Sequence, residues 1–140
     1  MSIKQTIILY LITLAVFFAI DMVWLGLVAK GFYRRHLGFL MTPQVKWAAA
    51  ILFYLLFIAG LLVFAVRPGL LLYNSPLAAF GLGALLGLIC YATYDLTNLA
   101  TIKDWPLLVT VIDLIWGTVL GGSVALVSAL LGRWLLKIRI

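Results

Sequence analysis

The sequence predicts an all-α integral membrane protein: an up-down bundle of four spanning helices, with a basic, aromatic interfacial segment between the first and second spans. Hydrophobic residues make up 66% of the 140 residues and charged residues only 10%, and the mean hydropathy is +1.25. That composition lies outside the range of a soluble domain, which needs a polar surface. Four stretches are also long enough to cross a hydrocarbon core of about 30 Å as helices.

The four spans are expected within one domain over residues 1–140, at about 6–28, 47–66, 76–98 and 106–131. Pro76 and Pro106 suit the starts of the third and fourth spans, because the first turn of a helix has N–H groups without partners. Asn74-Ser75 supplies an N-cap for the third span. Pro68-Gly69 is expected to break the chain after the second.

The connection from Lys30 to Lys46 interleaves basic and aromatic residues, which suits a segment at the membrane surface with its aromatic side inward. We favour a loop that sets topology and anchors the chain to lipid headgroups. The alternative is a ligand-binding role, for which Arg34, Arg35 and His36 are the candidates for contact with an anionic headgroup.

The formal charge of +6 arises because ten Lys and Arg residues face only four acids. Basic residues beside apolar spans serve topology and lipid headgroups, so the charge predicts membrane lipids and no nucleic acid as partners. The positive-inside rule returns a tie, so either other features set the orientation or the protein inserts both ways. One side of the membrane collects Lys4, Arg67, Arg133, Lys137 and Arg139, and the other Lys30, Arg34, Arg35, Lys46 and Lys103.

One face of the third span begins with small residues and ends with polar ones. Spaced at about 100 degrees per residue, its members are Gly83, Gly87, Tyr91, Tyr94, Asp95 and Asn98. The glycine pair predicts close packing of a neighbouring helix. An Asp at the centre of a span costs at least ~2.5 kcal/mol and is rarely idle, so the four polar residues are candidates for the floor of a site.

The fourth span reverses this order, with Asp113 near its start and Gly117-x-x-x-Gly121 deeper. Asp21 lies near the end of the first span and Asp95 near the end of the third. These three ends share one side of the membrane in an up-down bundle. The three carboxylates are therefore expected at one depth in one leaflet, beneath the basic loop.

Two of the acids are each followed after three residues by a tryptophan, in Asp21-x-x-Trp24 and Asp113-x-x-Trp116. This step places an indole beside the carboxylate on the helix surface, where its N–H can donate to a carboxylate oxygen. Such a hydrogen bond would help to hold a buried carboxylate in place.

Buried polar side chains also tie helices together, typically by about 0.6 kcal/mol per hydrogen bond. Three carboxylates at one level repel one another unless they are protonated or matched by cations, so a structural role alone would use them poorly. We therefore favour a pocket. The second span has little that is polar and is expected to be scaffold, and Cys90 a small apolar filler.

Several runs together resemble a known bacterial family. They are Asp21-x-x-Trp24-Leu-Gly before Phe32-Tyr33-Arg34, then Phe53-Tyr54 and Ala59-Gly60, then the run from Tyr91 to Thr101, and finally Asp113-x-x-Trp116-Gly117-Thr118. Over essentially its whole length the chain is similar to the small inner-membrane proteins of domain-of-unknown-function family twenty-one seventy-seven. The resemblance implies four spans and a bacterial cytoplasmic (inner) membrane location, and it brings no established activity.

Three functions from different classes stay open. The first is a pocket that binds or processes a lipid- or isoprenoid-like amphiphile, with its headgroup among the acids and its tail between helices. Its carboxylates could act as general acid and base, or hold Mg²⁺ against a phosphate. The second is a small proton-coupled transporter working as a homodimer. The third is a non-catalytic subunit that packs on a partner through its glycines. No enzyme or metal motif decides between them, and the sequence leaves the cofactor open.

Overall fold

The computed structural model describes residues 1–137, which contain helices and no strand. Four continuous helical stretches are long and apolar enough to cross a membrane, and they confirm the predicted all-α four-helix bundle. They extend beyond the predicted spans by up to five residues, at Leu71 and Leu136. These stretches are Ile3–Val28, Trp47–Leu71, Pro76–Thr101 and Leu107–Leu136.

The first two stretches each contain a π-helical turn. In the first, α1 (Ile3–Val23) continues into η1 (Trp24–Val28), and in the second, α3 (Trp47–Leu61) continues through η3 (Leu62–Val66) into α4 (Arg67–Leu71). The other two stretches are the single helices α5 (Pro76–Thr101) and α6 (Leu107–Leu136). The interfacial segment holds α2 (Phe32–Leu37) and the 3₁₀ turn η2 (Gly38–Leu40).

The second span does not break at Pro68-Gly69, and that prediction is wrong. The π-turn before it shifts the hydrogen-bond register, with the N–H of Arg67 donating to Leu62 five residues back. Pro68 then occupies the first turn of α4, where a missing N–H is tolerated. Gly69 serves close packing, because a Cβ there would lie 2.5 Å from the Cβ of Ala79 on α5.

The predicted cap of the third span is present, with Ser75 Oγ accepting a hydrogen bond from the N–H of Ala78 at 3.2 Å. Pro76 fills the first turn of α5. Pro106 lies one position earlier than predicted, directly before α6 at its N-cap.

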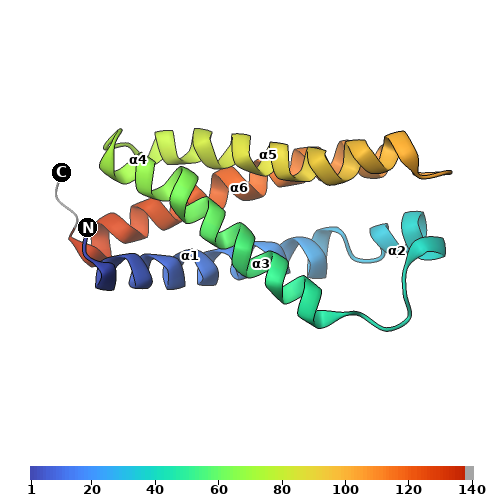
Figure 1. The fold of residues 1–140 in the computed structure, drawn as a ribbon, viewed down its shortest axis with the longest axis horizontal. Coiled ribbons are helices and arrows are strands. Elements are labelled where there is room, and N and C mark those ends of the chain that lie inside the picture. The colour runs from blue at the N-terminus through green and yellow to red at the C-terminus, as the bar shows by residue number, and fades with distance from the viewer. Residues whose placement is uncertain (138–140) are drawn as a thin grey trace.

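The longest interface joins α5 and α6, which lie side by side along most of their length (Figure 1). A Cβ added to Gly83 would collide with the carbonyl oxygen of Gly121, and one added to Gly87 with that of Gly117. All four glycines are buried. The two glycine pairs therefore face each other across this single interface, where they let the backbones touch.

The neighbour against which α3 packs changes along its length. Its first part packs on α1, where the Tyr10 hydroxyl donates to the Leu55 carbonyl at 3.0 Å, and makes little contact with α5. Its continuation η3 packs on α5 instead. Figure 1 shows α3 running diagonally between these two neighbours. α3 and α5 thus diverge toward the end of the molecule that carries α2.

The two ends of the bundle differ in what they gather (Figure 1). The N-terminus lies at one end, and α2 lies at the other, with the end of α1, the start of α3, the end of α5 and the start of α6. Asp21, Asp95 and Asp113 all belong to the α2 end. Of the basic residues counted for topology, Arg139 lies outside the described residues. That the chain folds as a single domain stays a prediction.

Candidate functional site

A small cavity at the α2 end draws its walls from all four spans and from α2. Its volume is about 190 Å³. We call it the aromatic chamber, and its lining residues are Asp21, Trp24, Leu25, Tyr33, Ala50, Phe53, Tyr54, Tyr91 and Trp116. The second span, expected as scaffold, contributes three of these residues.

The indoles of Trp24 and Trp116 stack at the chamber, with ring centroids 4.4 Å apart and planes 9° apart. The Trp24 N–H donates to the hydroxyl of Tyr33 at 3.2 Å, so the prediction that it serves Asp21 on its own helix is wrong. Trp116 interacts with Asp21 across the helix interface instead. The stack with Trp116 and the hydrogen bond to Tyr33 together fix the direction of the Trp24 N–H.

Tyr33 links α2 to the fourth span. Its hydroxyl donates to Asp113 Oδ1 at 2.7 Å. Burial, together with the hydrogen bond to Asp113 and the negative charge there, raises the pKa of the Tyr33 hydroxyl far above its ordinary value. Tyr33 therefore stays a neutral donor, and it fixes α2 over the chamber.

Asp95 on α5 lies close to Asp113 on α6. The Asp95 side chain is completely buried, and neither of its carboxylate oxygens has a hydrogen-bond partner among residues 1–137. Its backbone is held, since Thr110 Oγ1 receives the Trp105 indole N–H at 3.0 Å and donates to the Asp95 carbonyl at 3.4 Å. Among the described residues at the α2 end, the Asp95 carboxylate is therefore the buried polar group that lacks hydrogen-bond partners, although its backbone is fixed.

A second cavity, of about 340 Å³, lies beside the chamber. We call it the connecting cavity, and Phe53, Cys90, Tyr91, Tyr94 and Asp113 line it. It shares Phe53 and Tyr91 with the chamber. The connecting cavity therefore places Tyr94 of α5 and Asp113 of α6 next to the chamber.

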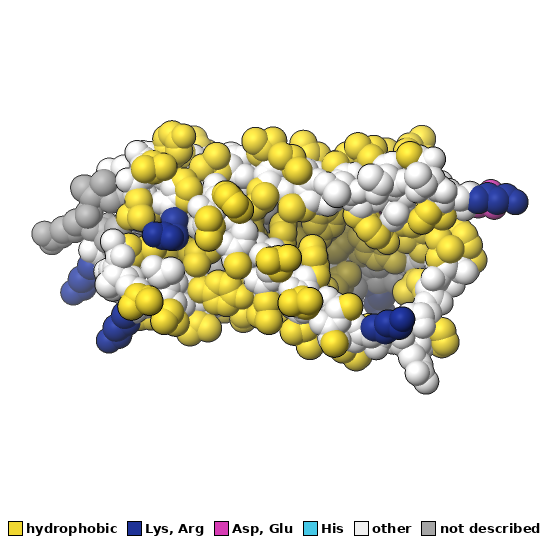
Figure 2. Space-filling model, in the orientation of Figure 1, with side chains coloured by type: hydrophobic (Ala, Val, Ile, Leu, Met, Phe, Trp, Pro, Cys, Tyr) yellow, Lys and Arg dark blue, Asp and Glu magenta, His cyan; other side chains and the backbone are white. Residues whose placement is uncertain are grey.

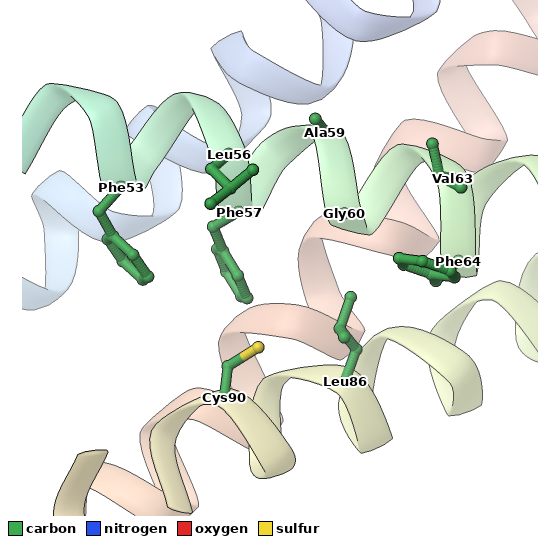
Figure 3. Close-up of a pocket in the computed structure, with 9 residues that line it drawn as sticks. All are labelled: Phe53, Leu56, Phe57, Ala59, Gly60, Val63, Phe64, Leu86 and Cys90. Carbon is green, nitrogen blue, oxygen red and sulfur yellow. The ribbon is translucent and has the colours of Figure 1, made fainter. Parts of the chain in front are cut away.

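The connecting cavity adjoins an apolar groove of about 450 Å³ between α3, η3 and α5, and both are lined by Phe53 and Cys90. Figure 2 shows a hollow on this face, toward the α2 end. In Figure 3 the rings of Phe53 and Phe57 point toward α5 while Leu86 and Cys90 point back toward α3. The groove is lined by Phe53, Leu56, Phe57, Ala59, Gly60, Val63, Phe64, Leu86 and Cys90. It follows directly from the divergence of α3 from α5.

Most of the predicted pocket residues gather around these cavities. The chamber has Asp21, Trp24, Tyr91 and Trp116 in its wall, and the connecting cavity has Tyr94 and Asp113. Asn98 lies beside Tyr94, outside the three cavities.

The predicted headgroup residues lie outside the chamber. Arg34 and Arg35 are exposed and line none of the three cavities, because Tyr33 turns inward and its neighbours on the short helix turn away. His36 folds against its own helix, with Nδ1 2.9 Å from the Phe32 carbonyl oxygen. Across residues 1–137, no group of three or more His, Cys, Asp or Glu side chains could hold a metal ion.

The family model described as predicted membrane protein, DUF2177, matches residues 6–130 of the chain. The chain belongs to this family. The match confirms the resemblance noted from the sequence runs. With its four candidate spans, this DUF2177 member is a multi-pass membrane protein. Comparison with curated proteins and with solved structures gave no match.

Proposed function

We propose that this protein binds a lipid- or isoprenoid-like amphiphile in the bacterial cytoplasmic membrane. The tail would lie in the apolar groove between α3 and α5, and the headgroup in the aromatic chamber. The observation that carries this proposal is that the three spaces adjoin: the groove and the connecting cavity both border Phe53 and Cys90, and the connecting cavity and the chamber both border Phe53 and Tyr91. An apolar space that leads to a few convergent polar groups is the usual form of a ligand site.

The groove suits entry from within the membrane. It opens between helices that are apolar enough to span a bilayer, so its mouth would face lipid tails. A tail moving sideways into it exchanges one apolar surrounding for another and never crosses water. The volumes of the groove and the connecting cavity each fall in the range of about 300–1,000 Å³ typical of ligand pockets.

Cys90 offers a direct test, because it is the single cysteine of the chain and lines both the groove and the connecting cavity. The rate at which a membrane-permeant maleimide alkylates Cys90 would be measured in delipidated protein, before and after the polar and isoprenoid lipids of the expressing bacterium are added back. We expect a several-fold slowing in the wild type.

Two matched glycine variants supply the control. Gly60→Leu fills the groove, where an added Cβ lies 3.8 Å from Leu86 Cδ2 and the longer side chain extends further. Gly81→Leu adds the same group in open space on α5. We expect the lipids to slow alkylation in Gly81→Leu and to leave it unchanged in Gly60→Leu. Equal slowing in all three proteins, or slowing in none, would overturn the proposal.

A small proton-coupled transporter is the second candidate, and the buried Asp95 carboxylate without a hydrogen-bond partner favours it. An acid that is buried beside a second acid can exchange a proton when a substrate arrives. Flux of a bound amphiphile into proteoliposomes under a proton gradient, abolished in Asp95→Asn, would support this candidate. Binding without flux would exclude it. A homodimer belongs to this candidate and stays a prediction.

The third reading, a subunit that packs on a partner through its glycines, is not favoured. Gly83, Gly87, Gly117 and Gly121 are all used inside the chain, between α5 and α6. These four glycines are therefore not available to a partner helix.

A further inference from the structure

The walls of the chamber and the connecting cavity are acidic without a matching cation. Asp21 is the charged residue of the chamber lining and Asp113 that of the connecting cavity, and neither lining includes Lys or Arg. Asp95 adds a completely buried carboxylate behind Asp113 whose oxygens have no hydrogen-bond partner in the described chain. A ligand headgroup entering here would meet negative or hydrogen-bond-accepting groups first.

The remaining chamber wall is mostly aromatic. Rings from three helices and from η1 and α2 surround Asp21, and two of them, Trp24 and Trp116, are held in one stack. Ammonium groups are attracted to the faces of Trp, Tyr and Phe, most strongly where water is excluded. Aromatic rings around a carboxylate therefore combine two features that favour a cation.

We propose that the headgroup bound in the chamber is an ammonium group, carried by an amphiphilic amine or a quaternary ammonium compound. This assignment rests on the proposed function and adds the chemical class of the ligand. A phosphate or carboxylate headgroup would have to lose its water beside Asp21 and Asp113 with no cation in the wall, so it is selected against. A neutral sugar headgroup could donate hydrogen bonds to Asp21 and stack on the rings, but it carries no positive charge to balance the carboxylates.

An ammonium headgroup has two sources in a membrane. One is an aminophospholipid, whose phosphate would remain nearer the surface, at the end of the bundle where α2 carries the exposed Arg34 and Arg35. The other is a single-chain amine without a phosphate. Both share the ammonium group, and the ligands chosen for the test separate them.

The test uses ligands that share one tail and differ in the headgroup. Protection of Cys90 from the maleimide would be titrated with dodecyltrimethylammonium, dodecylammonium, dodecyl phosphate and dodecyl maltoside, in micelles of a different neutral detergent. A short-chain phosphatidylethanolamine is the aminophospholipid arm. We expect the ammonium compounds to protect at concentrations at least about tenfold lower than the phosphate and the maltoside.

Asp21→Asn should remove this preference while tail binding remains, because it deletes the chamber's charge and keeps the side-chain shape. Asp104→Asn is the matched control, since Asp104 is exposed in the turn between α5 and α6. We expect it to behave as the wild type. Circular dichroism would verify that both variants keep their helices.

The outcomes distinguish a failure of the ammonium assignment from a failure of amphiphile binding itself. If all headgroups protect equally and Gly60→Leu abolishes protection, the groove binds tails and the ammonium assignment is wrong. An ammonium preference that persists in Asp21→Asn also overturns the assignment. If no compound protects Cys90, the proposed function fails as well. Stronger protection by phosphatidylethanolamine than by the single-chain amines would identify the aminophospholipid as the source, and weaker protection would identify the single-chain amine.

Discussion

The hydroxyl of Tyr33 connects three parts of the chain that are far apart in the sequence. It donates to Asp113 on α6 and accepts from the Trp24 indole at the end of the first span, while its own backbone belongs to α2. Few other contacts hold α2, which is only six residues long and has no buried residue. One phenol thus positions a surface segment over the chamber.

We predict that Tyr33→Phe loosens α2. The change leaves Asp113 without its donor and Trp24 without its acceptor, which typically costs about 1–3 kcal/mol when the groups are buried. Limited trypsin digestion should cut faster at Arg34 and Arg35, and thermal unfolding should begin at a lower temperature. Tyr73→Phe, at an exposed tyrosine of the opposite end, is the control. Digestion rates equal to the wild type would contradict the tether.

Asp95 differs from Tyr33, because its carboxylate is completely buried and makes no hydrogen bond within the described residues. We predict that Asp95→Asn leaves thermal stability equal to the wild type or higher, since no hydrogen bond is lost and a buried charge is removed. Under the transporter candidate, proton-coupled flux should also be lost. A large drop in the unfolding temperature would show that the carboxylate has a structural partner and would contradict this prediction.

At the scale of the elements, the α5–α6 interface sets the position of Tyr91. A Cβ on Gly117 would lie 2.5 Å from Cδ2 of the Tyr91 ring, and this ring lines both the chamber and the connecting cavity. The glycine on α6 therefore determines where a ligand-facing side chain of α5 can lie.

We predict that Gly117→Ala lowers stability by about 1–3 kcal/mol, as overpacking of a close interface does, and weakens amphiphile binding by displacing Tyr91. Gly26→Ala is the control, because a Cβ at Gly26 meets nothing within 4 Å. Thermal unfolding and Cys90 protection would be measured for both. If Gly117→Ala equals Gly26→Ala in both measurements, the packing of Tyr91 does not depend on this glycine.

The length and hydropathy of four apolar stretches were enough to predict the four helices, and helical periodicity predicted the shared face of the α5 residues. The end at which the three acids lie followed from an up-down order. Periodicity could not predict that Tyr33 turns inward, because Gly31 precedes α2 with a φ of 79° and resets the direction of the chain. It also could not give the tilt of α3, which depends on the π-turn at η3 and on packing against two different helices.

At the scale of the whole molecule, one departure from a closed bundle accounts for the candidate site. If α3 packed on α5 along its whole length, the groove would close and the chamber would have no route to the membrane. Instead α3 packs mainly on α1, and most of the contact with α5 is made by its continuation η3. Figure 2 shows Lys and Arg toward the two ends and hydrophobic side chains over most of the face between, where the hollow opens. The opening is therefore placed for a ligand that arrives from the lipid.

Mass spectrometry of the molecules that co-purify with the protein in a mild detergent tests amphiphile binding most directly. The wild type would be compared with an Asp21→Asn, Asp95→Asn, Asp113→Asn variant whose helicity is verified. We predict that a defined amphiphile accompanies the wild type and is lost from the variant, because its headgroup would lie among these carboxyl groups. Identical bulk phospholipids in both preparations, with nothing specific to the wild type, would contradict the amphiphile pocket.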